Sequence, residues 1–463
     1  MLDLVALEVE LASQTTRRRC GRVAAADGGA LLVAGLGRAA RLGDRIRLAA
    51  KADSPGPEGE IVALGPEGAR AMVVGGVAGV ALGDPVWLSP DPPLRPAESW
   101  LGRIVDAWGA PLDGKPLSAG PRPAPLRRPP PPAATRGGLG KRLSTGVAAL
   151  DSVLPLARGQ RIGIFAGSGV GKSRLLAQLA RGVEADIVVF GLIGERGREL
   201  GEFVADGLGP DGMARAVLVV ATSDESALAR RRAAWTATAV AEHFRDQGRH
   251  VLLILDSLTR FAEAHREIAL TAGETPSLRA YPPSTSNLIA ALAERAGPAG
   301  RRATDGAITA IYSVLVAGSD MEEPIADITR GVLDGHVVLD RGIAERGRFP
   351  AIDVGRSVSR ALPGAATPKE SEIIAEARRL LGAYEEARPM IQAGLWRQGA
   401  DPLLDRAVKL YPSLDAFFGA PTPAKGGLPA LAEIISGGDA ENSRVSRGSS
   451  PMTGKPSLSA GGR

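Results

Sequence analysis

The sequence contains very little cysteine, few aromatic residues and no long apolar run. Cys20 is the single cysteine among 463 residues, so no internal disulfide can form and no multi-cysteine metal site can exist. That composition fits a reducing compartment. No apolar run approaches the roughly 20 residues that a membrane-spanning helix needs. We therefore expect a soluble protein of the cytosol.

The charge is close to balanced. Lys and Arg number 56 against 51 Asp and Glu, which leaves a net charge of +5. Nucleic-acid binders concentrate basic charge and interleave it with aromatic side chains for base stacking. Aromatic residues make up 4% of the chain and show no such interleaving. An evenly solvated surface is the simpler interpretation, and a nucleic-acid partner is not expected.

The first quarter of the chain predicts a small β-barrel. We expect residues 1–19 to form an N-terminal segment with a weak amphipathic pattern, followed by a barrel domain over 20–120. Short strands at close spacing with Gly and Asp turns between them are typical of such barrels. The expected strands are Ala30–Val33, Arg45–Leu48, Glu60–Leu64, Ala69–Val74 and Pro85–Leu88.

Residues 121–138 are rich in proline. Because proline fixes φ and lacks an amide donor, we predict an extended linker between two domains. Recognition of this segment by a proline-binding module is the alternative.

Residues 139–360 alternate apolar runs with helix-like stretches, one of which is Ser226–Gln247. Continuously apolar strands separated by helices are typical of a parallel sheet covered on both faces. This pattern predicts an α/β core. Its expected strands are Arg161–Ala166, Asp186–Ile193, Ala216–Ala221, His250–Leu255, Ala307–Val316 and His336–Leu339.

The C-terminal part changes character again. Residues 361–420 have helical patterning without a strand signal, so we expect a small helical domain. Residues 421–463 are rich in Gly, Ser and Pro and lack the apolar content that offsets ordering entropy. We expect a disordered tail there, except that residues 429–436 suit a short docking helix.

A glycine-rich loop follows the expected strand Arg161–Ala166. Residues 166–173 read AGSGVGKS, with Ala166 in place of the first glycine of the strictest phosphate-loop motif. Glycines let the backbone wrap an anion, and the following helix adds its positive N-terminal end. Lys172 then neutralises phosphates and Ser173 offers its hydroxyl to Mg²⁺. The sequence therefore predicts an ATP and Mg²⁺ site formed by Gly167, Ser168, Gly169, Val170, Gly171, Lys172, Ser173 and Arg174.

Three carboxylates are candidates to complete this site. Asp256 ends an expected strand, which we place beside the phosphate-loop strand, and there it serves the metal. Glu195 follows another expected strand and is suited to polarise the attacking water. Glu199 is suited to assist through the water shell of the metal. The competing interpretation is that these residues are ordinary solvated or turn carboxylates.

Several motifs in order resemble the catalytic subunits of rotary ATP synthases and the related export ATPases. They are AGSGVGKS, GERGRE, LDSLTRFAEAHREI, AYPPSTSNLIAALAERAG and PAIDVGRSVSR. Two further stretches, ITAIYSVLVAGSDMEEPIAD and YEEARPMIQAGLWRQGADPLLDRAV, are most similar to the flagellum-specific export ATPase and the type III secretion ATPases. The resemblance covers roughly residues 20–418. It implies a multidomain α/β protein: an N-terminal β-barrel, a RecA-like P-loop domain with a mostly parallel sheet, and a C-terminal helical domain.

The resemblance also implies roles for individual residues. Glu195 is implied as the catalytic carboxylate, with Arg196 beside it, and Arg260 as a contact to the γ-phosphate. Phe349 is implied as the ring against adenine. Arg360 matches the arginine finger that enters the neighbouring subunit's site, where such a group raises turnover by about 10³–10⁵. A surface ion pair is the alternative for Arg360.

The function implied is ATP hydrolysis by a homohexamer that energises flagellar-type protein export. The implied partners are an export gate, a stalk, regulatory proteins and chaperone–substrate complexes, at a cytoplasmic ring docked peripherally on the inner membrane. An injectisome ATPase and a hexameric nucleic-acid motor remain as alternatives. The acidic run that synthase subunits use against a rotor is missing from residues 368–418, which argues against a synthase subunit. Glu195 argues against a non-catalytic one.

Overall fold

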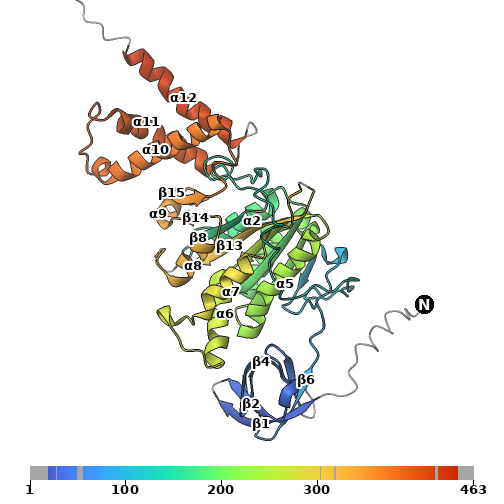
Figure 1. The fold of residues 1–463 in the computed structure, drawn as a ribbon. Coiled ribbons are helices and arrows are strands. Elements are labelled where there is room, and N and C mark those ends of the chain that lie inside the picture. Colours follow the sequence, from blue (N-terminus) through green and yellow to red (C-terminus); the bar gives the residue numbers. More distant parts are fainter. Residues whose placement is uncertain are drawn as a thin grey trace, which may run out of the picture.

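The computed structural model describes residues 19–27, 29–49, 56–302, 304–316, 320–422 and 426–446. Figure 1 shows the barrel at one end of the molecule, the sheet-containing domain in the middle and the C-terminal helices at the other end. The expected segment 1–19 lies outside the described residues except for its last residue, and residues 447–463 also lie outside them. Among the described residues, no helix combines the length and the apolarity that crossing a membrane requires.

The barrel is closed by six strands in the order β1-β2-β5-β4-β3-β6, each antiparallel to its neighbours. Its interior is filled by alternate residues such as Leu31, Val33, Ile46, Ile61 and Val86. The expected barrel is confirmed, with one further strand, β1, ahead of the five predicted ones. The strands are β1 Cys20–Asp27, β2 Ala30–Ala34, β3 Arg45–Leu48, β4 Glu58–Gly65, β5 Gly68–Val73 and β6 Pro85–Ser89.

The central domain contains a nine-stranded sheet in the order β15-β14-β8-β13-β11-β9-β10-β7, with β12 paired to β13. Strands from β14 to β7 run parallel, whereas β15 and β12 are antiparallel to their partners. The mostly parallel sheet is therefore confirmed. The strands are β7 Arg103–Val105, β8 Arg161–Ala166, β9 Ile187–Glu195, β10 Ala216–Thr222, β11 His250–Asp256, β12 Gly297–Pro298, β13 Ala307–Leu315, β14 Gly335–Leu339 and β15 Ile352–Ser359.

Each face of the sheet has its own apolar core, because successive side chains of a strand point to opposite faces. In β9, Val188 and Phe190 pack in the core that includes helix α2, Lys172–Gly182. Ile187 and Val189 pack instead against helices α5 and α6 on the other face. The remaining helices are η1 Gly37–Ala39, η2 Glu98–Trp100, α3 Gly197–Glu202, η3 Phe203–Leu208, α4 Gly209–Ala214, α5 Ala227–Arg245, α6 Leu258–Thr271, η4 Leu278–Ala280, α7 Ser284–Ala293, α8 Pro324–Val332 and α9 Arg341–Glu345.

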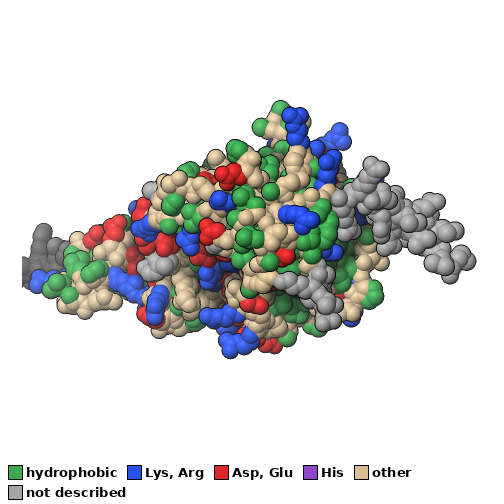
Figure 2. All heavy atoms as spheres, turned by 90° about the horizontal axis from the view of Figure 1, so that it is seen from below, with side chains coloured by type: hydrophobic (Ala, Val, Ile, Leu, Met, Phe, Trp, Pro, Cys, Tyr) green, Lys and Arg blue, Asp and Glu red, His purple; other side chains and the backbone are tan. Residues whose placement is uncertain are grey.

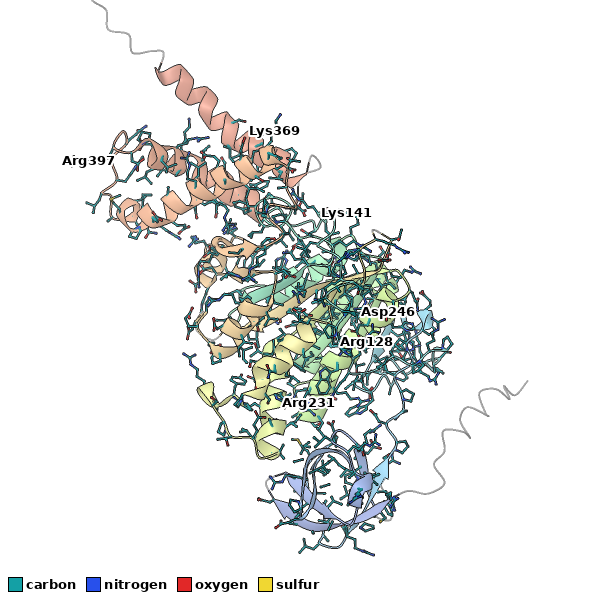
Figure 3. All side chains as sticks on the ribbon, viewed as in Figure 1. Arg128, Lys141, Arg231, Asp246, Lys369 and Arg397 are labelled. Atoms are coloured by element: carbon teal, nitrogen blue, oxygen red, sulfur yellow. The ribbon has the colours of Figure 1, made fainter. Side chains whose placement is uncertain are left out.

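The domain boundaries differ from those expected. Residues 103–105 form β7, which pairs with β10 at the edge of the central sheet, so the barrel ends well before residue 120. A three-residue strand is too short to show a period, so β7 could not be predicted from the hydrophobic pattern. The proline-rich segment 121–138 also contacts the central domain: Arg128 pairs with Asp246 at 2.6 Å (Figure 3) and Arg136 with Glu294.

The C-terminal domain consists of α10 Pro368–Gln392, α11 Pro402–Gly419 and α12 Gly427–Ser446. A capping box at Thr367 starts α10. Leu428, Leu431 and Ile435 of α12 are buried in the same core as α10 and α11. Residues 429–436, where a short docking helix was expected, form part of α12, since these three apolar residues, spaced three and four apart, bury one face of a helix. The expectation of disorder is wrong for the other residues of α12.

Candidate nucleotide-binding site

The phosphate loop lies between β8, which ends at Ala166, and α2, which begins at Lys172. Gly169 and Gly171 adopt positive φ angles of 77° and 85°, a region that side chains strain to enter. A Cβ atom at Gly171 would lie 3.1 Å from the Phe349 ring. The loop thus needs glycine at this position both for its turn and for the aromatic side chain that covers it.

The structure brings Lys172, Glu195 and Asp256 together at the carboxyl edge of the sheet. The Lys172 Nζ atom contacts Asp256 Oδ1 and lies 3.4 Å from Glu195 Oε1. Carboxyl ends of parallel strands are where ligands of α/β sheets bind. Lys172 is thus paired with two carboxylates. The phosphates of a bound nucleotide can replace these carboxylates as partners of the lysine.

The expectation that Asp256 ends the strand beside β8 is wrong. Strand β13 lies between β8 and β11, and Ser313 of β13 donates a hydrogen bond from its hydroxyl to Asp256 Oδ1. Lys172 therefore reaches across an intervening strand. Sequence reasoning missed Ser313, although a serine near the carboxyl end of a mostly apolar strand is a signal that could have been used.

The groups around Glu195 shift its pKa in opposite directions. Burial raises the pKa of its carboxyl group, and the charges of Asp256 and Glu199 raise it further, while Lys172 opposes them. A carboxylate with a raised pKa is a stronger base at neutral pH. Glu195 is therefore suited to accept a proton.

Oxygen donors are the ligands that Mg²⁺ prefers, and it normally keeps several waters beside one or two carboxylates and phosphates. The described residues hold no group of three or more His, Cys, Asp or Glu side chains that could bind a metal by themselves. The carboxylate of Asp256 and the hydroxyl of Ser173, next to Lys172 in the phosphate loop, fit a metal held mainly by phosphate and water.

Arg196, Glu199 and Arg260 lie beside this cluster rather than in it. Arg196 is 75% exposed and pairs with Glu199 at 3.4 Å. Arg260 pairs with Glu263 at 2.8 Å, and its aliphatic part covers Gly194, where a Cβ atom would lie 3.0 Å away. Both arginines flank Glu195, but neither guanidinium contacts it within the described structure.

A cavity of about 360 Å³ adjoins the phosphate loop. Phe349 forms part of its wall, as expected for a residue against a nucleotide base, and Arg174 reaches it from α2. Gln178 and the segment 419–421 also line it. Sequence reasoning missed Gln178 and this segment. The segment comes from the far end of α11, and only tertiary folding places it here.

Arg360 lies at the opposite edge of the sheet. Strand β15 begins at Ile352, which pairs with Leu339 of β14, and Leu339 in turn pairs with Ala166 at the end of β8. From there β15 runs antiparallel to β14 and ends at Ser359, which pairs with Gly335 at the start of β14. Gly335 lies four residues along β14 from Leu339, the residue level with Ala166, and at roughly 3.3 Å per residue this is about 13 Å. Arg360 is exposed and donates a hydrogen bond to the Leu333 carbonyl at 3.1 Å. It does not join the other site residues of its own chain.

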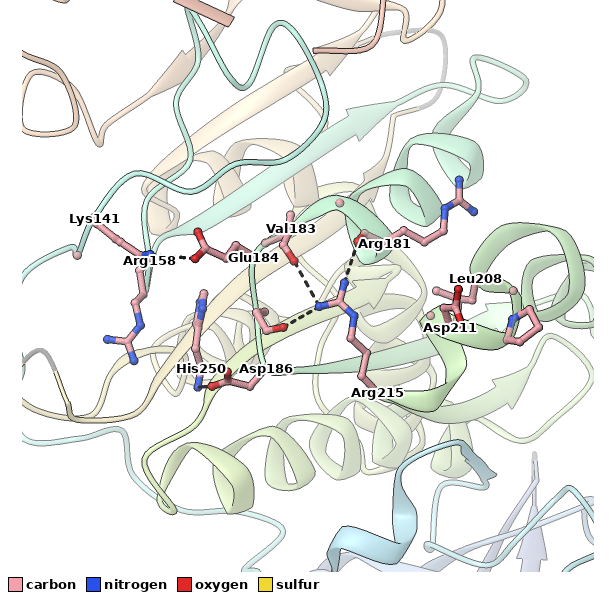
Figure 4. A pocket seen from close by; sticks show the side chains of 16 residues that line it. Lys141, Arg158, Arg181, Val183, Glu184, Asp186, Leu208, Asp211, Arg215 and His250 are labelled. Atoms are coloured by element: carbon pink, nitrogen blue, oxygen red, sulfur yellow. Dashed lines mark hydrogen bonds and ion pairs between the residues drawn. The ribbon is translucent and has the colours of Figure 1, made fainter. Parts of the chain in front are cut away.

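A larger cavity of about 1070 Å³ lies at the amino edge, away from the phosphate loop (Figure 4). Arg215 spans it, donating to the carbonyls of Ala185 at 2.6 Å and Ala180 at 2.8 Å. The His250 amide donates to Asp186 at 2.7 Å, and burial lowers the pKa of His250 to about 4. Because Arg215 and His250 already have partners within the protein, the smaller cavity beside the phosphate loop is the better candidate for a nucleotide.

The sequence matches two family models. The model of the ATP synthase alpha/beta family, nucleotide-binding domain, covers residues 146–359. The model of the T3SS EscN ATPase C-terminal domain covers residues 366–421. A flagellum-specific ATP synthase of Caulobacter vibrioides is 49% identical over 404 residues, which are 86% of this chain and 90% of that protein. The chain belongs to the flagellar and type III secretion ATPase family.

Other members of the family agree. A flagellum-specific ATP synthase of Bacillus subtilis is 41% identical over 402 residues, covering 86% of this chain and 90% of that protein. The assembled ATPase EscN of the type III secretion system of enteropathogenic E. coli is 36% identical with a TM-score of 0.83, over 90% of this chain and all of that one. EscN with its central stalk EscO gives a TM-score of 0.79 over the same shares. Family membership assigns ATP hydrolysis to this chain.

Proposed function

We propose that six copies of this chain form a ring that hydrolyses ATP between neighbours and energises flagellar-type protein export. The observation that carries the proposal is the separation of the site residues. Lys172, Glu195 and Asp256 meet at one edge of the sheet, whereas Arg360 lies at the other. A closed head-to-tail ring brings these unlike edges together at every interface. The solved relative EscN is described as assembled and as bound to a central stalk.

In the proposed reaction, Lys172 leaves its two carboxylates for the phosphates of ATP. Glu195 then orients the attacking water and accepts its proton on a carboxylate oxygen. Arg360 of the neighbouring copy stabilises the charge that develops on the transferred phosphoryl group. Ser173 and Asp256 would hold Mg²⁺, which neutralises phosphate charge when it is bound. Arg196 and Arg260, on either side of Glu195, keep their proposed roles as site residues, and Glu199 supports the metal's water shell.

The base is proposed to lie against Phe349. The ring is 40% exposed and lines the cavity next to Gly171, so a planar base can stack on it without displacing the core. Aromatic faces prefer offset stacking with other rings. The cavity is continuous with the phosphate loop through Gly171 and Arg174.

The export part of the proposal rests on the relatives named above. A stalk, an export gate, regulatory proteins and chaperone–substrate complexes are the proposed partners, with the ring docked peripherally on the inner membrane. Flagellar export is favoured over an injectisome because a flagellum-specific relative is 49% identical over 86% of this chain, against 43% over 77% for a type 3 secretion system ATPase.

A nucleic-acid motor finds less support. Figure 2 shows basic and acidic side chains mixed across the face that it presents. The tryptophans ahead of the ATPase core have packing roles: Trp100 is buried, Trp108 lies beneath Arg45 and Arg232, and Trp87 belongs to barrel strand β6. None is arranged as an open stacking platform for bases.

The proposed function is tested by replacing the cell's own copy with Glu195→Gln. We expect normal protein levels with loss of flagellar subunits from the medium. Continued export at the parental rate contradicts the role in export. In parallel, the ATPase rate of the purified protein is measured with single-stranded RNA and with an export chaperone–substrate complex. A many-fold rise with RNA alone contradicts the proposal in favour of a nucleic-acid motor.

A further inference from the structure

An ion pair between a buried arginine and an aspartate that is 33% exposed joins the helical domain to the loop that carries Phe349. Arg348 directly precedes Phe349, between α9 and β15. Its side chain is 10% exposed, and its Nε atom lies 3.0 Å from Asp415 Oδ1 on α11. Its Nη2 atom donates to the Ile352 carbonyl at 3.0 Å. Arg348 is therefore held both by the start of β15 and by a helix of another domain.

The pair differs from the surface pairs of the same region. Arg341 and Glu345 on α9 also form an ion pair at 3.0 Å, but their side chains are 75% and 65% exposed. Exposed pairs contribute little, whereas removing one partner of a buried pair leaves an uncompensated charge. Burial lowers the pKa of Arg348 and the charge of Asp415 opposes that effect. Asp415 is thus the group that makes a buried guanidinium acceptable at this position.

The pair lies directly behind the wall of the proposed base cavity. A Cβ atom at Gly419, one turn of α11 after Asp415, would lie 3.1 Å from Arg348 Cγ and 3.9 Å from the Phe349 carbonyl oxygen. Phe349 and Gly419 both line the cavity. Arg348 therefore packs behind two parts of the wall that come from different domains.

We propose that the Arg348–Asp415 pair is a positioning device for the nucleotide base. It fixes the spacing between Phe349 and the 419–421 segment, and so sets the affinity for the base without touching the phosphates. This inference rests on the proposed stacking of the base on Phe349. It also makes α11 part of the nucleotide site, so that nucleotide binding is coupled to the helical domain.

The test compares two ligands that share phosphates but not a base. Dissociation constants of MgADP and of magnesium pyrophosphate are measured for the full chain and for Asp415→Asn. We expect the MgADP constant to rise about 10-fold and the pyrophosphate constant to change less than about 2-fold. The matched control is Glu345→Gln, which removes a carboxylate from the exposed pair on α9 and leaves both constants unchanged.

A double-mutant cycle with Phe349→Ala separates positioning from a general loss of structure. In the Phe349→Ala background, Asp415→Asn should raise the MgADP constant by less than about 2-fold, because the ring it positions is gone. Equal losses for both ligands, or full additivity in the cycle, overturn the proposal. If Asp415→Asn does not fold, judged by thermal unfolding, Asp415→Glu retains the charge at a longer reach, and an unchanged MgADP constant in that folded variant overturns the proposal.

The same measurements separate this inference from the proposal beneath it. If the parent protein binds magnesium pyrophosphate as tightly as MgADP, the base gains nothing from Phe349, and both the stacking of the base and its positioning by the pair fail. If the parent prefers MgADP and Asp415→Asn keeps that preference, only the positioning role of the pair fails.

Discussion

The two edges of the central sheet use charged side chains in different ways. At the carboxyl edge, Lys172 is held by Glu195 and Asp256, three side chains from three elements. At the amino edge, Arg215 is occupied by main-chain carbonyls. Side-chain partners can be exchanged for a ligand, whereas carbonyls at the end of a helix cannot move without unwinding it. The carboxyl edge is therefore suited to a changing ligand and most of the amino edge to stability.

Arg360 lies at the amino edge but is proposed to act in catalysis. Its replacement should have the largest effect on turnover. We expect Arg360→Ala to lower kcat by about 10³-fold or more while MgATP binding is retained, since a guanidinium supplied in trans acts on the transition state. The matched control is Arg356→Ala on the same strand, whose side chain is also exposed and lies 3.7 Å from Asp340. It should change kcat less than about 2-fold.

A mixture of two inactive variants tests whether Glu195 and Arg360 of one catalytic site come from different copies of the chain. Arg360→Ala and Glu195→Gln, each inactive alone, are mixed under conditions that allow subunit exchange, and the ATPase rate is recorded. A mixed interface joins an intact Glu195 to an intact Arg360, so part of the activity should return. Glu195→Gln mixed with Lys172→Ala is the control, because both changes remove the same edge of the interface. No recovery in the first mixture would place the arginine elsewhere.

Glu195→Gln should have the next largest effect. Loss of the proton acceptor is expected to lower kcat by about 10²–10⁴-fold, with MgADP affinity kept, because the amide retains the size of the side chain. Glu202→Gln on the exposed end of α3 is the control and should leave kcat within about 2-fold. Steady-state kinetics and equilibrium binding check both statements. A loss of MgADP binding equal to the loss of turnover would contradict a catalytic role.

Much of the nucleotide site was accessible from the sequence because its signals are local. The phosphate loop is one strand, one turn and one helix start, and its glycines show the backbone that they permit. Glu195 and Asp256 each end an apolar run, and parallel strands bring such ends together. Family resemblance supplied the expected roles of Phe349 and Arg360, which have no local signal of their own.

What the sequence did not indicate depends on tertiary placement. The short strand β7 carries no period, and the position of β13 between β8 and β11 follows from packing rather than from any motif. Gly419 enters the base cavity from a helix of another domain. The helix α12 extends beyond residues 429–436, where a short helix was expected, and the rest was assigned to a disordered tail because glycine and serine outnumber apolar residues over 421–463 as a whole. Only the spacing of its apolar residues Leu428, Leu431 and Ile435 indicates that one face of α12 is buried.

The structural role of the amino edge can be sharpened with Arg215. We expect Arg215→Met to lower the free energy of unfolding by about 2 kcal/mol, because carbonyls at the C-terminal end of α2 lose a charged donor. Thermal unfolding should shift down by about 5 °C, with KM and kcat unchanged. Lys141→Met is the control, because Lys141 lines the same cavity but is 67% exposed and pairs with the exposed Glu184 at 3.0 Å. Altered nucleotide affinity without a change in stability would instead connect this cavity to the nucleotide site.

The smallest expected effect concerns the pKa of Glu195 at the carboxyl edge. The carboxylate is the active form, and its pKa is raised, so turnover should fall on the acid side at a higher pH than an ordinary glutamate would cause. The charge of Glu199 contributes to that rise. Glu199→Gln removes a like charge, lowers the pKa of Glu195 and should move the acid limb of kcat down by about 0.3 pH units. Arg198→Gln, which lies on the same helix and is paired with Glu202 at 3.8 Å, should leave the limb in place. An acid limb that moves upward in Glu199→Gln would mean that another group titrates, and Glu195 would lose its assignment as the base.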